Sequence, residues 1–591
     1  MANKKNKFKG IFNWTFFAIA VAAVILINIV ASFVNFRLDA TNDKRYSLSE
    51  GTAKYLKNDE KLDNRLYIKI YLDGKLPSEL SYFRDAIEDK LKEFKVYAGK
   101  KIEYEFIDPT EGTEGEQNEL YENIYAKGKG IVPMDLQFKK DGQRSQMLVW
   151  PGALIEYAGS TKNVIQFLPG TPLGKPVQLE NIGQTIQNSL NNLEYILMTS
   201  IRRTVEKTKP VIGILQGHGE LEYSETQRAR ALISPYYSLR DITINDSLAA
   251  MDGVDGLIIA RPTGKFSNKD LYVIDQFLMR GGKLMCFMDA LTLNEDTLMA
   301  TGITHTARVS TGLEKMLFDY GLKLNDNFVI DVRCAPKVVP LAKQTLIPWY
   351  YHVLATPTPH PISRNLEPVS LKYVSEIQFV GNQEIALTPV LTSSTNSTRT
   401  GMAPMISLGM PMNYGKNPKL VIDPENPANK LCLAGIAEGF FQSHFKNRIV
   451  DDFAKNPLIN YKEKSEKEGK VLLVGNGNFI ENAYDTMMGK NGLMFKPKEY
   501  NDLRFDPKLM EMGVEIFYGN QEFFQNAVDY MLGDNSVLDI RSKQIDIHQI
   551  DNEKVAQSAS FYKWVNMLLP CLVVVLLSLV FFYIRKRKYT S

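Results

Sequence analysis

The sequence predicts an α/β protein with two α/β domains, flanked by two single transmembrane helices. Three observations predict this architecture. A strand–helix–strand pattern occupies residues 65–109, and near-continuous apolar runs separated by helical patterns begin at residue 210. An uncharged apolar stretch also lies near each end of the chain. At about 150 residues per domain, a chain of 591 residues has room for several domains.

The first domain is predicted to begin with a βαβ unit. RLYIKIYL (65–72) and KIEYEFIDP (101–109) alternate apolar and polar residues, as half-buried strands do. Between them, Ser78 can cap a helix that ends at Gly99. The crossover between two such parallel strands is right-handed in nearly all proteins. Further strand-like runs occupy residues 131–138, 144–150, 152–158 and 163–168.

The second domain is predicted to contain a parallel sheet that is buried on both faces. A long amphipathic helix over 179–207 leads into the strand PVIGIL (210–215). The runs YYSLRDITI, DGLIIA and KLMCFMD continue the strand pattern, with a helix over about 268–280. Apolar runs of this kind, separated by helices, are typical of sheets covered on both sides.

The pattern loosens from about 300 to 465, where proline and short polar residues predict an irregular insertion of loops and short strands. It resumes with KVLLVGNGNFIENA (470–483) and a helix over 520–532. The chain is therefore divided into a cytoplasmic tail (1–10), a first transmembrane helix (11–36), a periplasmic α/β domain (37–207), a second periplasmic α/β domain (208–535) with the insertion, a connector (536–563), a second transmembrane helix (564–584) and a basic cytoplasmic tail (585–591).

The two apolar stretches predict membrane anchors. Residues 10–36 and 564–584 are uncharged, and each is long enough to cross a hydrocarbon core of about 30 Å as a helix. A cleaved signal peptide is the alternative for the first stretch. Lysines precede the first stretch and RKRK (585–588) follows the second, so both termini are predicted to be cytoplasmic in a bacterial inner membrane. The net charge of +3 resides in these tails around an acidic body, which does not predict nucleic-acid binding.

GHGELE (217–222) is the first candidate site, because it directly follows the strand PVIGIL. Ligands of open parallel sheets bind at the carboxyl ends of strands, so Gly217, His218, Gly219 and Glu220 are candidate ligand-binding residues. The alternative is a tight glycine turn capped by polar groups. A metal site is not predicted, because no further ligands of suitable spacing are evident.

GNGN (475–478) is the second candidate, with Asn476 and Asn478 as ligand-binding residues. It could cradle a phosphate at a helix N-terminus, or it could form a turn with an asparagine cap. Ile480 stands where the GxGxxG fingerprint needs glycine, which favours the turn. Asp289 ends the strand KLMCFMD and could act as an acid, although no paired carboxylate is identifiable.

Catalytic motifs are absent from the sequence. It contains no GxxxxGK[ST], GxSxG or HExxH, and its four cysteines include no CxxC pair. Cys286 lies within an apolar strand rather than on a glycine-flanked nucleophile elbow. We therefore predict no enzymatic activity, no catalytic residue and no cofactor.

Several motifs resemble one family in sequence order: RYSLSEGTAKYL (45–56), KPVIGILQGHGELE (209–222), VDGLIIARPTGKFSNKDLYVIDQFLMRGGKLMCFMD (254–289) and the terminal apolar segment with its basic tail. The chain resembles the gliding-motility-associated ABC transporter auxiliary proteins of the Bacteroidota, the GldG family, over nearly its full length. The resemblance implies a thioredoxin-like first domain and a flavodoxin-like, amidotransferase-like second domain. It also implies a GldF-like membrane permease and a GldA-like cytoplasmic ATPase as partners, and a role as the substrate-binding component.

Three functional hypotheses follow. The first is a non-enzymatic, inner-membrane-anchored periplasmic subunit of an ABC transporter complex required for gliding motility and linked protein secretion, which binds an envelope partner or transmits ATP-driven movement. The second is a binding protein that delivers a small envelope-derived ligand to the permease. The third is a degenerate hydrolase that depends on His218.

Overall fold

In the computed structural model of this chain, the description covers residues 47–533 and short pieces near both ends. The gaps within 47–533 are residues 126–129, 141–142, 160, 171–175, 207, 341–343, 365, 382–383, 412–429, 447, 449–460, 490–491, 499–500 and 515. The pieces near the ends are residues 19, 21–23, 567–569, 572, 575–583 and 586–587. The chain divides into two units, 1–543 and 544–591.

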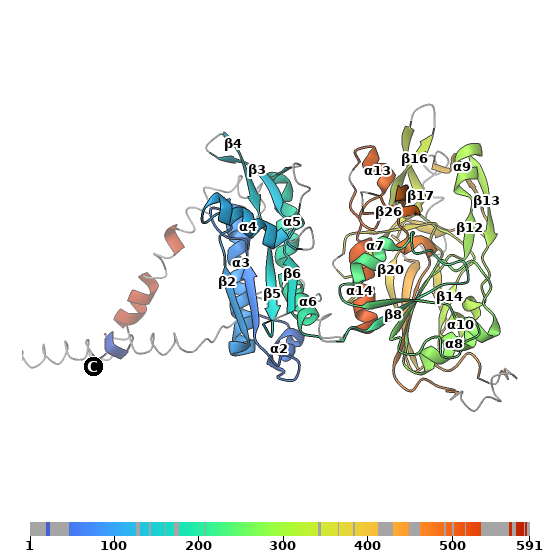
Figure 1. Cartoon of the computed structure of the whole chain (residues 1–591), viewed down its shortest axis with the longest axis horizontal. Helices are drawn as coiled ribbons and strands as arrows, with labels where there is room; N and C mark the ends of the chain where they lie inside the picture. The colour runs from blue at the N-terminus through green and yellow to red at the C-terminus, as the bar shows by residue number, and fades with distance from the viewer. Residues whose placement is uncertain are drawn as a thin grey trace, which may run out of the picture. The chain divides into compact units, whose positions relative to one another are not determined.

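The first sheet has the order β2-β1-β5-β6 (Figure 1). β1 (Leu66–Ile70) pairs parallel with β2 (Ile102–Phe106) and antiparallel with β5 (Gly152–Tyr157). β5 pairs antiparallel with β6 (Thr161–Gln166). Because α3 (Ser78–Ala98) connects β1 to β2, the predicted βαβ unit is confirmed.

The helix α3 covers this sheet with one apolar face. Its residues at spacings of three and four are fully buried, and they are Leu80, Phe83, Ile87, Leu91 and Phe94. The helix ends at Gly99, whose φ of 62° suits glycine. The N-cap is Pro77 rather than Ser78, so the predicted cap was wrong by one residue.

The long helix predicted over 179–207 is interrupted. A short 3₁₀ turn (Leu179–Ile182) precedes α5 (Gly183–Asn191) and α6 (Leu193–Val205). Asn192 lies between the two helices, and its φ of −98° and ψ of 6° are not helical values. Asparagine competes with helical hydrogen bonding, which a count of apolar spacings does not register. The remaining elements here are α2 (Glu50–Lys57), η1 (Gly99–Lys101), α4 (Glu114–Tyr125), β3 (Met134–Lys140), β4 (Gln143–Val149) and β7 (Val177–Gln178).

The second sheet has the path β16-β17-β20-β23-β24-β11-β10-β8-β9. Its parallel part consists of β8 (Val211–Leu215), β9 (Ser238–Ile242), β10 (Gly256–Ala260), β11 (Lys283–Phe287) and β24 (Gly469–Val474). In chain order these five strands lie as 2-1-3-4-5, one of the common doubly wound arrangements. The predicted mixed α/β architecture with a parallel sheet is therefore confirmed.

Helices cover both faces of the parallel strands (Figure 1). Ile258 of β10 shares a core with α7 (Gln227–Ile233) and α14 (Asn520–Leu532). Its neighbours on β10, Leu257 and Ile259, point to the opposite face and pack with α8 (Asn268–Met279) and α10 (Leu313–Asp319). All five residues of β10 are buried, as the continuous apolar run predicts.

The segment 300–465 differs from the irregular insertion that the sequence predicts. β17 (Gln344–Pro357), β20 (Ile385–Thr392) and β23 (Cys432–Gly439) are long strands that extend the main sheet from β24. The prediction of loops and short strands was wrong for them, because β20 accommodates Pro389 at an irregularity in its pairing. The other elements of this domain are α9 (Glu295–Thr301), α13 (Pro507–Glu511), β12 (Leu291–Leu293), β13 (Ile303–Arg308), β14 (Leu322–Leu324), β15 (Val329–Asp331), β16 (Cys334–Pro340), β18 (Val369–Lys372), β19 (Ile377–Phe379), β21 (Ser397–Arg399), β22 (Met405–Ser407), η5 (Gly477–Ile480), β25 (Tyr484–Gly489) and β26 (Gly492–Pro497).

Among the described residues, no helix combines the length and the apolar character that crossing a bilayer requires. The first predicted span, 11–36, lies outside the described residues except at 19 and 21–23. The second, 564–584, is described at 567–569, 572 and 575–583. These residues are helical, and their large apolar side chains are exposed.

Candidate functional site

The candidate site lies at the carboxyl edge of the parallel strands. Because β8, β10, β11 and β24 are parallel, the loops that follow them meet at one edge of the sheet. These loops contain all six candidate ligand-binding residues, together with Arg261 and Asp289. The candidate residues form two groups, one in the loop after β8 and one in the loop after β24.

His218 bridges the loop after β8 to the start of α8. Its Nδ1 lies 3.3 Å from Oε1 of Glu220, and its Nε2 lies 3.2 Å from Oδ2 of Asp270. The ring stacks on Phe266 with centroids 3.8 Å apart. Burial lowers the pKa of His218, but the hydrogen bonds and charges of the two carboxylates outweigh burial, so its pKa is raised above the ordinary value.

The glycines on either side of His218 shape this loop. Gly217 has φ 116° and Gly219 has φ 74°, and a Cβ at Gly219 would clash with Oγ1 of Thr263. The carbonyl of His218 accepts hydrogen bonds from the backbone of Thr263 (3.0 Å) and Gly264 (2.6 Å). These contacts tie the loops after β8 and β10 together, which is the role of a capped glycine turn. Ligand binding by these residues stays a prediction.

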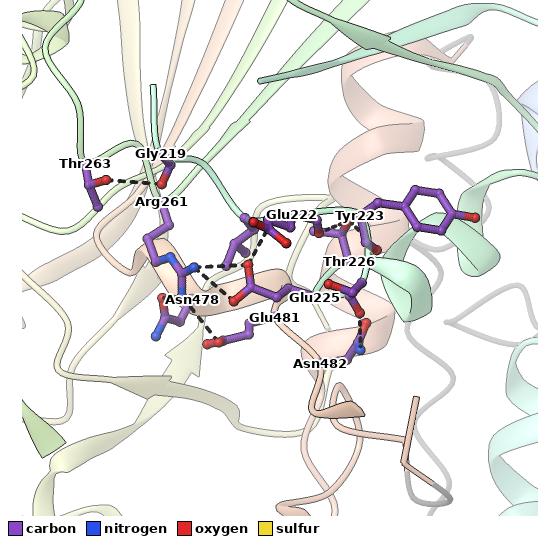
Figure 2. Close-up of polar contacts among 12 residues, drawn as sticks. Gly219, Glu222, Tyr223, Glu225, Thr226, Arg261, Thr263, Asn478, Glu481 and Asn482 are labelled. Carbon is purple, nitrogen blue, oxygen red and sulfur yellow. Dashed lines mark hydrogen bonds and ion pairs between the residues drawn. The ribbon is translucent and has the colours of Figure 1, made fainter. Parts of the chain in front are cut away.

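Arg261, directly after β10, is the centre of a charged cluster that sequence reasoning missed (Figure 2). Its guanidinium lies 3.1 Å from both carboxylate oxygens of Glu225 and 3.3 Å from Oε1 of Glu481. Asn478 contributes its amide oxygen at 3.5 Å. Arg261 adopts the left-handed backbone region with φ 53°, which points to a constrained turn. The sequence feature that could have identified Arg261 is its position, because it is a charged residue directly after the buried run DGLIIA.

The loop after β24 connects three segments of the chain. Asn476 accepts a hydrogen bond from the backbone N–H of Lys372 (3.3 Å) and donates one to the carbonyl of Lys372 (3.0 Å). The backbone N–H of Gly477 donates to Oδ1 of Asp289 at 2.6 Å. Only η5 follows, a 3₁₀ turn of four residues. The helix N-terminus on which the phosphate-cradle interpretation depends does not form at these residues, and ligand binding by Asn476 and Asn478 stays a prediction.

A cavity of about 490 Å³ lies beside this loop, within the size range of small-molecule sites. Residues after β11 and β24 form one side of it. The rest is formed by α9, by strands β16, β17 and β18, by the segment 502–509, and by Lys498, Tyr518 and Asn520. Of the candidate residues, Asn476 and Asn478 line this cavity, whereas those of the loop after β8 do not.

Two buried polar side chains in the cavity wall lack hydrogen-bond partners among the residues that the structure describes. They are His352, with both ring nitrogens, and Tyr518, with its hydroxyl. Each residue is only 5% exposed. Burial, and then the charges of three nearby lysines, lowers the pKa of His352 well below its ordinary value. Such groups are rare in native proteins, because an unsatisfied buried group costs about 1–3 kcal/mol.

Asp289 and Asp502 bring carboxyl groups to the same cavity. Burial raises the pKa of each to about 6. At Asp289 the hydrogen bonds of Gly477 and Asn476 and the charge of Arg261 oppose the rise, and at Asp502 the charge of Arg228 opposes it most. Oδ2 of Asp502 accepts a hydrogen bond from the backbone of Ala483 at 3.2 Å. Within the described ranges, neither carboxyl forms an ion pair.

Two other carboxylates in the wall are paired with lysines. Nζ of Lys337 lies 2.7 Å from Oε1 of Glu295, which also accepts a 2.6 Å hydrogen bond from the hydroxyl of Tyr373. Nζ of Lys372 lies 3.0 Å from Oδ2 of Asp506. The cavity therefore combines internally paired charges with carboxyl groups that have no ionic partner among the described residues.

Metal and thiol chemistry find little support in this part of the chain. In the described residues no group of three His, Cys, Asp or Glu side chains could hold a metal ion. Burial raises the pKa of the thiols of Cys286, Cys334 and Cys432, which is the opposite of what a nucleophilic cysteine requires. Cys286 is fully buried within β11.

Comparisons with known proteins match most of the chain. Residues 209–527 match the family described as an ABC-type uncharacterized transport system, and residues 42–156 match a domain of unknown function (DUF7088). An uncharacterized protein of Borreliella burgdorferi is 22% identical over 463 residues, which are 77% of this chain and 82% of that protein. The solved mmIFT52 N-terminal domain aligns with 57% of this chain and 99% of its own, at 12% identity and a TM-score of 0.30. A TM-score this low does not establish a common fold.

Proposed function

The chain belongs to the family of ABC-type uncharacterized transport systems, and on this basis we propose that it serves as a non-enzymatic auxiliary subunit that binds a ligand for its transporter. The sequence has no P-loop, so the ATPase of such a transporter resides in another subunit. The family match over 209–527 supports the auxiliary role, and it implies association with a permease and an ATPase.

The observation that carries the ligand-binding role is the cavity at the carboxyl edge of the sheet. It has a volume of about 490 Å³ and it is bordered by buried groups that lack partners among the described residues. Open parallel sheets bind their ligands at this edge. The strand order 2-1-3-4-5 supports a flavodoxin-like second domain, and the order β2-β1-β5-β6 supports a thioredoxin-like first domain.

We also propose the finer assignment that the family resemblance implies. In it, the partners are a GldF-like permease and a GldA-like ATPase, and the complex serves gliding motility and linked protein secretion. The body is periplasmic and the two apolar stretches, 11–36 and 564–584, anchor it in the inner membrane. The exposed apolar side chains of the helical residues 575–583 support an anchor, because such a surface is unfavourable in water. In this role the subunit could also bind an envelope partner or transmit ATP-driven movement.

Co-purification from membranes of the source organism tests the proposal. A tagged full-length chain in mild detergent is expected to recover a permease and an ATPase in a constant ratio. An equally tagged, unrelated two-span membrane protein is the control. Recovery of the chain without either protein, together with unchanged gliding after deletion of its gene, would overturn the proposal.

A further inference from the structure

The cavity wall contains two chemically different sets of groups. The first set is Asp289, which follows β11, and Asp502, which lies in the segment 502–509; neither forms an ion pair within the described residues. Asp289 lies deep in the protein but keeps some accessible surface. Since Asp289 lines the cavity, this surface is available to a ligand. These two carboxyl groups suit a positively charged group.

The second set is His352 and Tyr518, in the same wall as the ion pair of Lys372 and Asp506. His352 is the direct partner of Lys372 in the pairing of β17 with β18. Lys337, Lys372 and Lys508 create a positive potential at His352, and Asp506 acts on Tyr518 through its charge. The imidazole and the phenol each carry a donor that is unused among the described residues. This second set therefore suits a negatively charged acceptor.

Ligands with one kind of charge fit the cavity less well. Four lysines line the cavity, and three of them are already paired: Lys337 with Glu295, Lys372 with Asp506 and Lys498 with Glu511, at 2.7, 3.0 and 3.3 Å. An inorganic anion would therefore meet one lysine, Lys508, that has no ion pair within the described residues, and it would also lie in a cavity with two carboxyls that have no ionic partner there. A simple cation would leave the His352 and Tyr518 donors unused, and a neutral sugar would leave the carboxyls without a charged partner.

We propose that this cavity binds a zwitterionic small molecule, an amino acid or a short peptide, with its ammonium group at the Asp289 or Asp502 carboxyl and its carboxylate at the His352 or Tyr518 donor. The inference rests on the proposed ligand-binding role and adds the chemical class of the ligand. Burial raises the pKa of both aspartates to about 6, and a bound ammonium group would lower it again.

A series of end-capped peptides tests the charges separately. Binding of the twenty L-amino acids and of L-alanyl-L-alanine to the full-length chain in detergent is measured by calorimetry. N-acetyl-L-alanyl-L-alanine lacks the ammonium, and L-alanyl-L-alaninamide lacks the carboxylate. At least one compound with both free ends is expected to bind, and capping either end should weaken binding about tenfold or more. Inorganic phosphate and N-acetylglucosamine serve as the competing ligand classes.

Two variants connect the binding to the two sets of groups in the cavity wall. Asp502→Asn should weaken binding of the free peptide but not of its acetylated form, whereas the exposed control Asp485→Asn should bind like the wild type. His352→Phe should fold, because an apolar ring replaces nitrogens that have no hydrogen-bond partner among the described residues, but it should lose the preference for a free carboxylate.

Three outcomes overturn the inference: equal binding of free and capped compounds, tighter binding of phosphate or of the sugar, and no binding of any probe. If no probe binds but the chain still co-purifies with the permease and the ATPase, the zwitterion assignment is wrong and the auxiliary role stands. If co-purification fails as well, the proposed function itself is wrong.

Discussion

Replacing Asp289 by asparagine should change how the stability of the second domain depends on pH. The pKa of Asp289 rises from 3.8 to about 6, chiefly because the carboxyl is buried. At 1.36 kcal/mol per pKa unit, this difference corresponds to about 3 kcal/mol. Asparagine preserves the local geometry, since its amide oxygen can still accept the 2.6 Å hydrogen bond from the backbone of Gly477.

The sign follows from which state binds the proton more tightly. The folded state has the raised pKa, so this contribution to stability is fully present below about pH 4 and is lost as the pH rises through about 6. Asparagine does not titrate. The stability of the wild type minus that of Asp289→Asn should therefore fall by up to about 3 kcal/mol between about pH 4 and pH 7.

Urea denaturation of the full-length chain in detergent measures this difference. The fluorescence of buried Trp349 reports on the second domain when the other three tryptophans are replaced by phenylalanine. Asp485→Asn is the matched control, because the side chain of Asp485 is exposed on β25. A difference between wild type and Asp289→Asn that stays within about 0.5 kcal/mol over this pH range would refute the reasoning.

Three further substitutions test other parts of the account by the same denaturation assay. Gly475→Ala should destabilise the domain by about 1–3 kcal/mol, because its Cβ would clash with the carbonyl oxygen of Ser375; wild-type stability would show that the chain relaxes there. Tyr320→Phe should cost about 1–3 kcal/mol, since the hydroxyl of Tyr320 donates a buried 2.6 Å hydrogen bond to Asp275, and a neutral effect would contradict that bond. His218→Gln should lose more stability at about pH 5.5 than at about pH 8. The raised pKa means that protonated His218 stabilises the fold at low pH, and this contribution disappears as the pH rises through the pKa of the folded state. A loss of stability that does not depend on pH would argue against the ion pairs of His218 with Glu220 and Asp270.

The sequence predicted secondary structure best in segments where several neighbouring residues meet one physical requirement, such as burial. The buried run GLIIA became β10 with all five residues inside, and the helix predicted over about 268–280 became α8, which begins with a capping box between Ser267 and Asp270. The strand ends also placed Asp289 and Asn476 at one edge of the sheet, and both line the same cavity. These features depend on local composition and on a general rule for parallel sheets.

The residues that complete the cavity could not be found in this way. His352 lies in the middle of β17 and Tyr518 lies just before α14, both far in sequence from the strand ends that they approach. Neither belongs to a motif, and nothing local shows that their polar atoms are buried without partners among the described residues. The proline-rich segment also concealed β17 and β20, because interrupted strands lack a clear alternating pattern.

ATP hydrolysis by the partner permease and ATPase tests the central claim most directly. The two proteins are reconstituted in nanodiscs, and the rate is measured with and without the full-length chain. The account predicts that the chain joins the complex and changes the rate, because an auxiliary subunit shifts the conformational equilibrium of its transporter. An unchanged rate at every concentration of the chain, with the chain eluting apart from the two proteins, would contradict it.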